Sequence, residues 1–298
     1  MAVHLGGQRQ RDNRVAAGEA YWHLVGRRFR RHRLAVIGGS VAIFLSLAAL
    51  LAPWLAPYRP DQINLGNRWA IPSRAHPFGT DELGRDVLSR AMHAGRVSLA
   101  VGYGSALGVA LAGTVAGVVA GYYGGVADSV IMRLVDILLA LPTIPLYLIM
   151  AALIPGGGVA RIMLIFVLFG WTGAARLVRG QVLSLRQQDF VEAARALGAS
   201  EVRIMLRHLV PNVMAPIIVA TTLAVGGFIL GESALSYLGL GIQPPTASWG
   251  NMLQRAQEYV WNASWLAVFP GVLIFMTVLG FNFLGDGLRD VLDPRLKI

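Results

Sequence analysis

Apolar and polar residues are arranged in long blocks along this chain. Six apolar runs have about the length that an α-helix needs to cross the hydrocarbon core of a bilayer, and they cover residues 34–56, 97–122, 130–154, 159–178, 213–240 and 266–284. Because the bilayer core offers no water to backbone N–H and C=O groups, such runs are expected to be helical. The pattern therefore predicts an all-α polytopic membrane protein with six transmembrane helices.

Arginines beside these runs orient the predicted helices. The segment RRFRRHR, residues 27–33, directly precedes the first run. By the positive-inside rule, it keeps a basic N-terminal tail, residues 1–33, in the cytoplasm. We interpret residues 34–56 as an uncleaved first span, because the run is about twice as long as the apolar region of a secretory signal. An even number of spans then returns the C-terminal tail, residues 286–298, to the cytoplasm.

Two outer segments are expected between the spans. Residues 57–96 follow the first span, and within them we expect a helix on the membrane surface over residues 76–90, with Thr80 as its N-cap. The second outer segment begins near residue 243. Its aromatic residues indicate an interfacial belt, and they are Trp249, Tyr259, Trp261 and Trp265. Residues 97–285 hold the other five spans and form the predicted core.

A polar island, residues 186–211, lies between the fourth and fifth runs. Its first half has helical periodicity from Asp189 onward, Gly198 supplies a helix stop, and Ser200 can cap a second helix. Pro211 is expected to end that second helix. We therefore predict two short helices joined at Gly198. The second helix has an apolar face that is expected to dock on another protein, and its residues are Val202, Met205, Leu206 and Leu209.

Glycines recur every four residues in the second run, at Gly113, Gly117, Gly121 and Gly125. This spacing places them on one face of a helix. Glycines there let a second helix approach closely, so we expect a helix-packing seam.

Two acidic residues lie within apolar runs. Asp136 follows Arg133 by three residues, and we expect a local ion pair on one helix face. Glu232, next to Ser233, has two possible roles. It faces a water-filled translocation path, or it hydrogen-bonds within the protein near the outer interface.

Composition agrees with a membrane protein and excludes several function classes. Of 298 residues, 55% are hydrophobic and 14% are charged, which is too apolar for a soluble domain. The net charge of +10 is almost wholly arginine beside apolar runs, which fits the lipid bilayer rather than nucleic acid. The sole lysine, Lys297, cannot supply a phosphate-binding P-loop. Cysteine is absent, so thiolate metal sites are excluded, and no catalytic or metal constellation is found.

Three motifs resemble one known family. The polar island contains Glu192, Ala193, Ala194, Gly198 and Pro211 in the arrangement of the EAA loop of bacterial ABC-importer permeases. The strings HPFGTDELGRD (residues 76–86) and ESALSYLGLG (residues 232–241) resemble the C-type permease subunit of the oligopeptide, dipeptide and nickel branch. His208 and Val210 depart from the general EAA pattern, but the ending HLVPN resembles this same branch.

The resemblance implies a fold, a function and partners. It implies a type I importer permease in the bacterial plasma membrane, with both ends cytoplasmic and no cofactor of its own. The EAA loop would then couple this chain to two ATPase subunits or domains that bind ATP and magnesium. A second, homologous permease and an extracytoplasmic substrate-binding protein complete the implied importer of dipeptides or oligopeptides.

Other functions are compatible with the same residues. Relatives in this family handle nickel chelates or glutathione instead of longer peptides. A proton-coupled secondary transporter would use Asp136 and Glu232 as proton sites, but it usually carries internal repeats, and no convincing pair of repeats is present.

Overall fold

The structure, a computed structural model, describes residues 26–292. Within this range the regular elements are helices, apart from one isolated β-bridge between Thr80 and Asp86. Residues 1–25 of the predicted N-terminal tail and residues 293–298 of the predicted C-terminal tail lie outside the described residues.

Within residues 26–292, five helices are long and apolar enough to cross a membrane. They are α2 (Arg33–Leu50), α4 (Val87–Tyr123), α7 (Val159–Leu185), α10 (Val210–Tyr237) with the turns that precede it, and α12 (Trp265–Leu292). The third predicted span is a pair, α5 (Gly125–Ala140) and α6 (Thr143–Leu153), which is bent by 93° at Pro142. The bend follows from proline, which disfavours helical geometry in the residue before it. The predicted all-α membrane fold is confirmed, with its third span broken.

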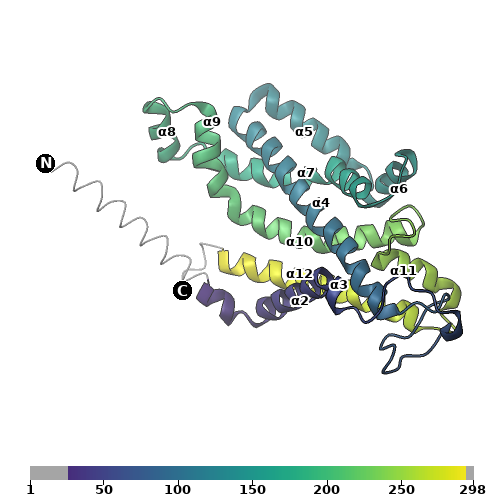
Figure 1. The fold of residues 1–298 in the computed structure, drawn as a ribbon. Coiled ribbons are helices and arrows are strands. Elements are labelled where there is room, and N and C mark those ends of the chain that lie inside the picture. The colour runs from purple at the N-terminus through teal and green to yellow at the C-terminus, as the bar shows by residue number, and fades with distance from the viewer. Residues whose placement is uncertain (1–25, 293–298) are drawn as a thin grey trace.

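Helix α4 runs through the middle of the bundle and contacts α7, α10 and α2, while α12 packs on both α2 and α10 (Figure 1). Two short helices, α8 (Asp189–Ala196) and α9 (Glu201–Ile204), project at the end of the bundle where α2 begins and α12 ends (Figure 1). Helix α11 (Trp249–Ala256), the four-residue helix α3 (Ala52–Leu55) and the long loop before α4 lie toward the opposite end (Figure 1). The elbow and the described ends of the chain thus lie at one end of the bundle, and the two segments predicted to be outer lie toward the other (Figure 1).

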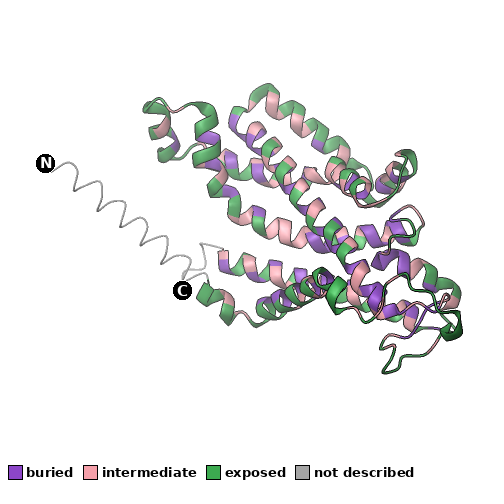
Figure 2. Ribbon diagram, viewed as in Figure 1, coloured by how far each residue is buried: buried purple, intermediate pink, exposed green. Residues whose placement is uncertain are grey.

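Burial follows the lines along which helices meet. Buried residues follow the inner faces of the bundle, whereas the outer faces of α2 and α5 are mostly exposed (Figure 2). Many exposed side chains are large and apolar, among them Phe44 on α2 and Val130 on α5. Lipid rather than water covers such surfaces in a membrane protein.

The glycine seam on α4 holds this helix against α7. A Cβ atom added to Gly117 would lie 2.5 Å from the carbonyl oxygen of Ala175, and one added to Gly121 would lie 2.8 Å from Cβ of Val182. Gly113 meets the same helix, so the predicted packing is confirmed for these three glycines. It is wrong for Gly125, because the chain turns at Gly124 and starts α5 there.

The surface helix predicted over residues 76–90 is wrong. Residues before Asp86 form a loop in which Gly84 has a φ of +70° and Asp81 Oδ1 accepts hydrogen bonds from the N–H groups of Leu83 and Arg85. Thr80 caps no helix; its hydroxyl donates to the carbonyl of Asn67. The N-cap is Asp86, and the helix that it starts is α4 itself. Bonds from the acidic side chains to the local backbone compete with helix formation here.

We expect Gly117→Ala to destabilise the bundle by about 1–3 kcal/mol, because the added methyl group would overpack a contact with backbone atoms. Gly173→Ala is the matched control, since a Cβ atom there meets nothing within 4 Å. Thermal unfolding of both variants in detergent measures the difference. Equal melting temperatures would contradict the structural role of the seam.

Candidate functional site

The polar island forms an elbow of two short helices, as predicted. Helix α8 stops at Ala196, and Gly198 has a φ of +78°, which is the left-handed conformation that favours glycine. Ser200 is extended at the N-cap of α9, although its side chain makes no capping hydrogen bond. Glu192 and Ala193 are exposed on α8, and Ala194 is half-buried. We define the elbow as residues 189–204.

The four residues of the predicted docking face on the second helix differ in burial. Met205 and Leu209 are buried against α4, α7 and α10, so their prediction as docking residues is wrong. The reason is that α9 continues into α10 and turns this side toward the bundle. Val202 and Leu206 are exposed. Leu206, however, lines an apolar groove of the bundle beside α2 and α4, rather than the outer side of the elbow.

The exposed apolar residues of the elbow are therefore a different set. Leu197 is 88% exposed, and Phe190 and Val202 are also exposed. Phe190 lies in the first turn of α8, and Leu197 is the C-cap residue that follows this helix. These three are the large apolar side chains that the elbow exposes.

Pro211 does not end the second helix, contrary to the prediction. Residues Met205–Leu209 form a π-helical turn, and α10 begins directly after it with Pro211 in its first turn. Proline has no N–H group and lacks the bond that an α-helix requires four residues back. In the wider π turn the backbone hydrogen bonds reach five residues back instead of four, and the N–H group of Val210 accordingly bonds the carbonyl of Met205. Helix α9, the π turn and α10 are thus one continuous element.

Two arginines, Arg179 in α7 and Arg186 at the C-cap of α7, hold the turn between α4 and α5. Arg179 makes a two-pronged ion pair with Asp128, at 2.5 and 2.7 Å. Arg186 donates from one nitrogen to the carbonyls of Gly121 and Tyr122 at the end of α4. Charged donors near the last carbonyls stabilise a helix end. These contacts brace the α7 end from which the elbow projects.

Glu232 is fully buried near the other end of α10. Its Oε2 accepts a hydrogen bond from Ser98 of α4 at 3.0 Å, and its Oε1 accepts one from Ser236 at 2.6 Å. Ser98 Oγ in turn accepts from the N–H group of Trp249 at the start of α11. Ser233 is buried beside it, and its hydroxyl has no partner among the residues that the structure describes. The hydrogen-bonding alternative for Glu232 therefore describes this conformation.

Asp136 pairs with a different arginine from the predicted one. Arg176 of α7 donates from Nη2 to Asp136 Oδ1 at 2.6 Å, whereas Arg133 makes no ion pair among the described residues. Sequence spacing along one helix could not reveal this partner, because α5 folds back against α7. The pair is more than half exposed.

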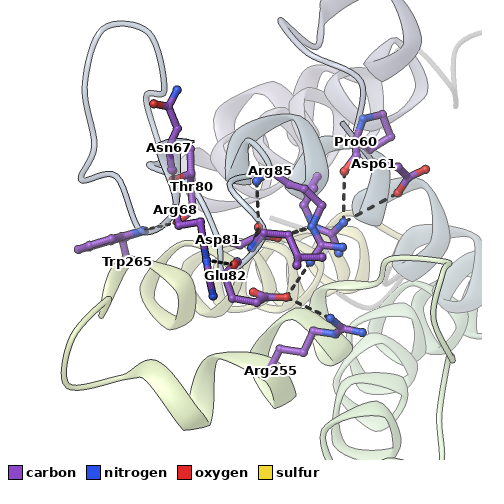
Figure 3. Close-up of polar contacts among 12 residues, drawn as sticks. Pro60, Asp61, Asn67, Arg68, Thr80, Asp81, Glu82, Arg85, Arg255 and Trp265 are labelled. Carbon is purple, nitrogen blue, oxygen red and sulfur yellow. Dashed lines mark hydrogen bonds and ion pairs between the residues drawn. The ribbon is translucent and has the colours of Figure 1, made fainter. Parts of the chain in front are cut away.

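A cluster of charges joins the loop before α4 to α11, as Figure 3 shows. Arg85 donates to Asp81 at 2.6 Å and to Glu82 at 2.8 Å, and Arg255 of α11 donates to the same Glu82 oxygen at 3.1 Å. Arg90 donates to the carbonyl of Pro60. The acids of this cluster thus bond to arginine. Within residues 26–292, no group of three or more His, Cys, Asp or Glu side chains is placed to hold a metal ion.

Two further residues differ from the sequence-based expectation. Trp249 is buried and donates from its indole to the carbonyl of Ala91, so its assignment to an interfacial aromatic belt is wrong. Arg161, near the outer end of α7, donates to carbonyls after α6 and α10, with 2.6 Å to that of Leu240. Sequence reasoning missed Arg161, because arginine near a span was used only to mark the cytoplasmic side.

We expect Glu232→Ala to loosen α11, because Ser98 and Ser236 would lose their shared acceptor in a buried site, at a cost of about 1–3 kcal/mol. Hydrogen–deuterium exchange of residues 249–256 in the detergent-solubilised protein should become faster. Ser233→Ala is the control, since its hydroxyl makes no bond among the described residues. Unchanged exchange in the Glu232 variant would show that the carboxylate does not hold α11.

Comparisons with known proteins agree with the motifs. Residues 113–298 match the family described as the binding-protein-dependent transport system inner membrane component, and residues 20–77 match the N-terminal transmembrane domain of oligopeptide transport permease C. The chain is 45% identical over 285 residues to the glutathione transport system permease protein GsiD of Escherichia coli O6:K15:H31, with 93% of this chain and 91% of that protein covered. The protein of the same name from Shigella boydii serotype 4 is equally similar.

These matches cover nearly the whole chain. A binding-protein-dependent system works with ATPase and substrate-binding partners, and the permease is its non-catalytic, multi-pass inner membrane component. The chain belongs to the inner membrane permeases of binding-protein-dependent ABC importers, and within them to the oligopeptide permease C type.

Proposed function

We propose that this chain is one permease subunit of an ATP-driven importer for short peptides of the glutathione class. It forms half of the translocation path, and a second, homologous permease forms the other half. ATP and magnesium bind to two separate ATPase subunits or domains. A substrate-binding protein outside the membrane delivers the peptide, and both ends of this chain lie in the cytoplasm.

The continuity of the elbow with α10 carries the coupling part of this proposal. The elbow exposes Phe190, Leu197 and Val202 toward the outside of the bundle, which suits docking on an ATPase. Because α9 and the π turn lead directly into α10, a movement of α9 reaches α10 at Pro211 without an intervening loop. Rigid-body movement of such an element is a common way to switch between two states.

Glutathione is supported by the identity of 45% with the glutathione permease over nearly the full length. Dipeptides, oligopeptides and nickel chelates are the other cargoes of the resembled branch. Glu232 and Ser233 are both buried in this conformation. A role for them in lining the path therefore requires α11 to move away from α10.

We expect Leu197→Asp to prevent the ATPase subunits from co-purifying with this chain, because a charge would replace an apolar side chain in the docking surface. Val126→Asp is the matched control: Val126 is a similarly exposed apolar residue at the start of α5, outside the elbow. Binding is measured by quantifying the ATPase subunits retained on the tagged permease from solubilised membranes. Full retention by the Leu197 variant would contradict docking through this residue.

The assembled importer, reconstituted in liposomes with its binding protein, should accumulate labelled glutathione only when ATP is supplied. Because ATP hydrolysis drives the proposed conformational cycle, a hydrolysis-deficient ATPase should reduce uptake to background. Competition with a dipeptide and with a nickel chelate ranks the alternatives. Uptake driven by a proton gradient without ATPase subunits would contradict the proposal and favour a secondary transporter.

A further inference from the structure

Two ion pairs join α5 to α7, and they differ in exposure. The side chains of Asp128 and Arg179 are 19% and 31% exposed, and they brace the corner of the bundle. Those of Asp136 and Arg176 are 61% and 54% exposed. The second pair therefore faces outward from this subunit, and its surroundings need an explanation.

The exposed pair lies deeper in the spanning region than the bracing pair. At about 1.5 Å per residue, Arg176 lies about 4.5 Å further from the cytoplasmic end of α7 than Arg179. Asp136 lies about 12 Å further along α5 than Asp128 by the same rise. Its neighbours Leu134 and Ile137 are exposed and apolar, as in a spanning helix. Charges at this depth are costly against lipid, so they face water or protein.

A hollow opens against α7 close to Arg176 in the chain, although its lining includes neither residue of the pair. It has a volume of about 220 Å³, lies between α4, α7 and α10, and its lining includes Gly170, Gly173, Ala220 and Thr221. Gly173 precedes Arg176 by one helical turn. A Cβ atom added at Gly173 or Gly180 meets nothing within 4 Å, so neither glycine is needed for packing within this subunit. The space beside Arg176 is thus open.

The pair retains unused hydrogen-bonding capacity. Among the described residues, one hydrogen bond joins the two side chains, and neither makes another. A guanidinium has five N–H donors, and a carboxylate has two acceptor oxygens. Arg176 can therefore bind a carboxylate, and Asp136 can bind an ammonium group. Exposed ion pairs contribute little to stability, so this one can exchange its partner for a passing ligand.

We propose that Asp136 and Arg176 line the translocation path and transiently bind the carboxylate and ammonium groups of a short peptide. The identity of the cargo rests on the proposed function, whereas the exposure of the pair to water does not. Binding by one exposed pair is weak, and transport requires sites that release their cargo. Glu232, which is buried and satisfied by two serines, is not suited to this role in the present conformation.

The absence of cysteine from this chain permits a direct test. When the subunits are separated on a gel, any thiol label on this chain must be on a cysteine that was introduced by mutation. The variants Gly173→Cys, which leaves the ion pair intact, and Arg176→Cys are made in the assembled importer. A charged, membrane-impermeant thiol reagent is then applied to right-side-out and to inverted membrane vesicles. Phe44→Cys on α2, exposed on a helix with apolar neighbours, sets the background for a lipid-facing position.

Both variants should react about tenfold or more faster than the Phe44 variant from at least one side, because the reactive thiolate forms in water and not in lipid. Rates no higher than that background at both positions would overturn the proposal, and a dry contact with the second permease would then cover this face.

S-Methylglutathione, a glutathione analogue whose blocked sulfur does not react with the thiol reagent, should at saturating concentration slow labelling of Gly173→Cys, and the added substitution Arg176→Gln should remove this protection. A bracing role alone would not change this protection, because the labelling rate without the analogue measures any change in packing. Protection that persists in the Arg176→Gln background would overturn the assignment of Arg176 to peptide binding. An importer that accumulates a nickel chelate but no glutathione would contradict the proposed cargo, while the labelling rates would still decide whether the pair faces water.

Discussion

The close contact of α4 with α7 is the constraint on which the rest of the structure depends. Gly117 and Gly121 allow the two backbones to approach, and a single methyl group at either position would force them apart. Inside a membrane, apolar burial does not favour one helix contact over lipid, so close packing of small residues has to hold helices together. The seam fixes the end of α7 from which the elbow projects, and Arg186 fastens this end to α4. The elbow therefore has a rigid base.

Helix α10 connects the two ends of the molecule. At its start, the π turn joins it without a break to α9, the second helix of the elbow. Near its other end, Glu232 binds Ser98 of α4, and that serine also accepts from the start of α11. A displacement of the elbow would therefore reach the contact that holds α11, along one helix of 28 residues. In the function proposed above, this helix would link ATP hydrolysis by partner subunits to opening on the outer side.

Charged residues in this protein fall into three groups. Arginines such as those at residues 27–33 orient the spans relative to the membrane. Others, including Arg161 and Arg186, donate hydrogen bonds to backbone carbonyl groups at helix ends that would otherwise lack partners. The pair of Asp136 and Arg176 fits neither role, because it is exposed and makes a single hydrogen bond among the described residues. Its exposure separates it from the bracing contacts.

The sequence by itself determined the helical membrane fold, the six apolar runs, the glycine seam and the elbow at Gly198, because length, hydropathy and glycine spacing are local properties of the chain. It also supplied the motifs that resemble the permease family. Only the tertiary structure decided which arginine pairs with Asp136, that Glu232 meets Ser98 across 134 positions, and that Met205 and Leu209 face inward. It also replaced the surface helix at residues 76–90 with a loop. In each case the deciding partner comes from another helix or from the loop's own backbone bonds, and helical periodicity records which residues share a face but not what that face meets.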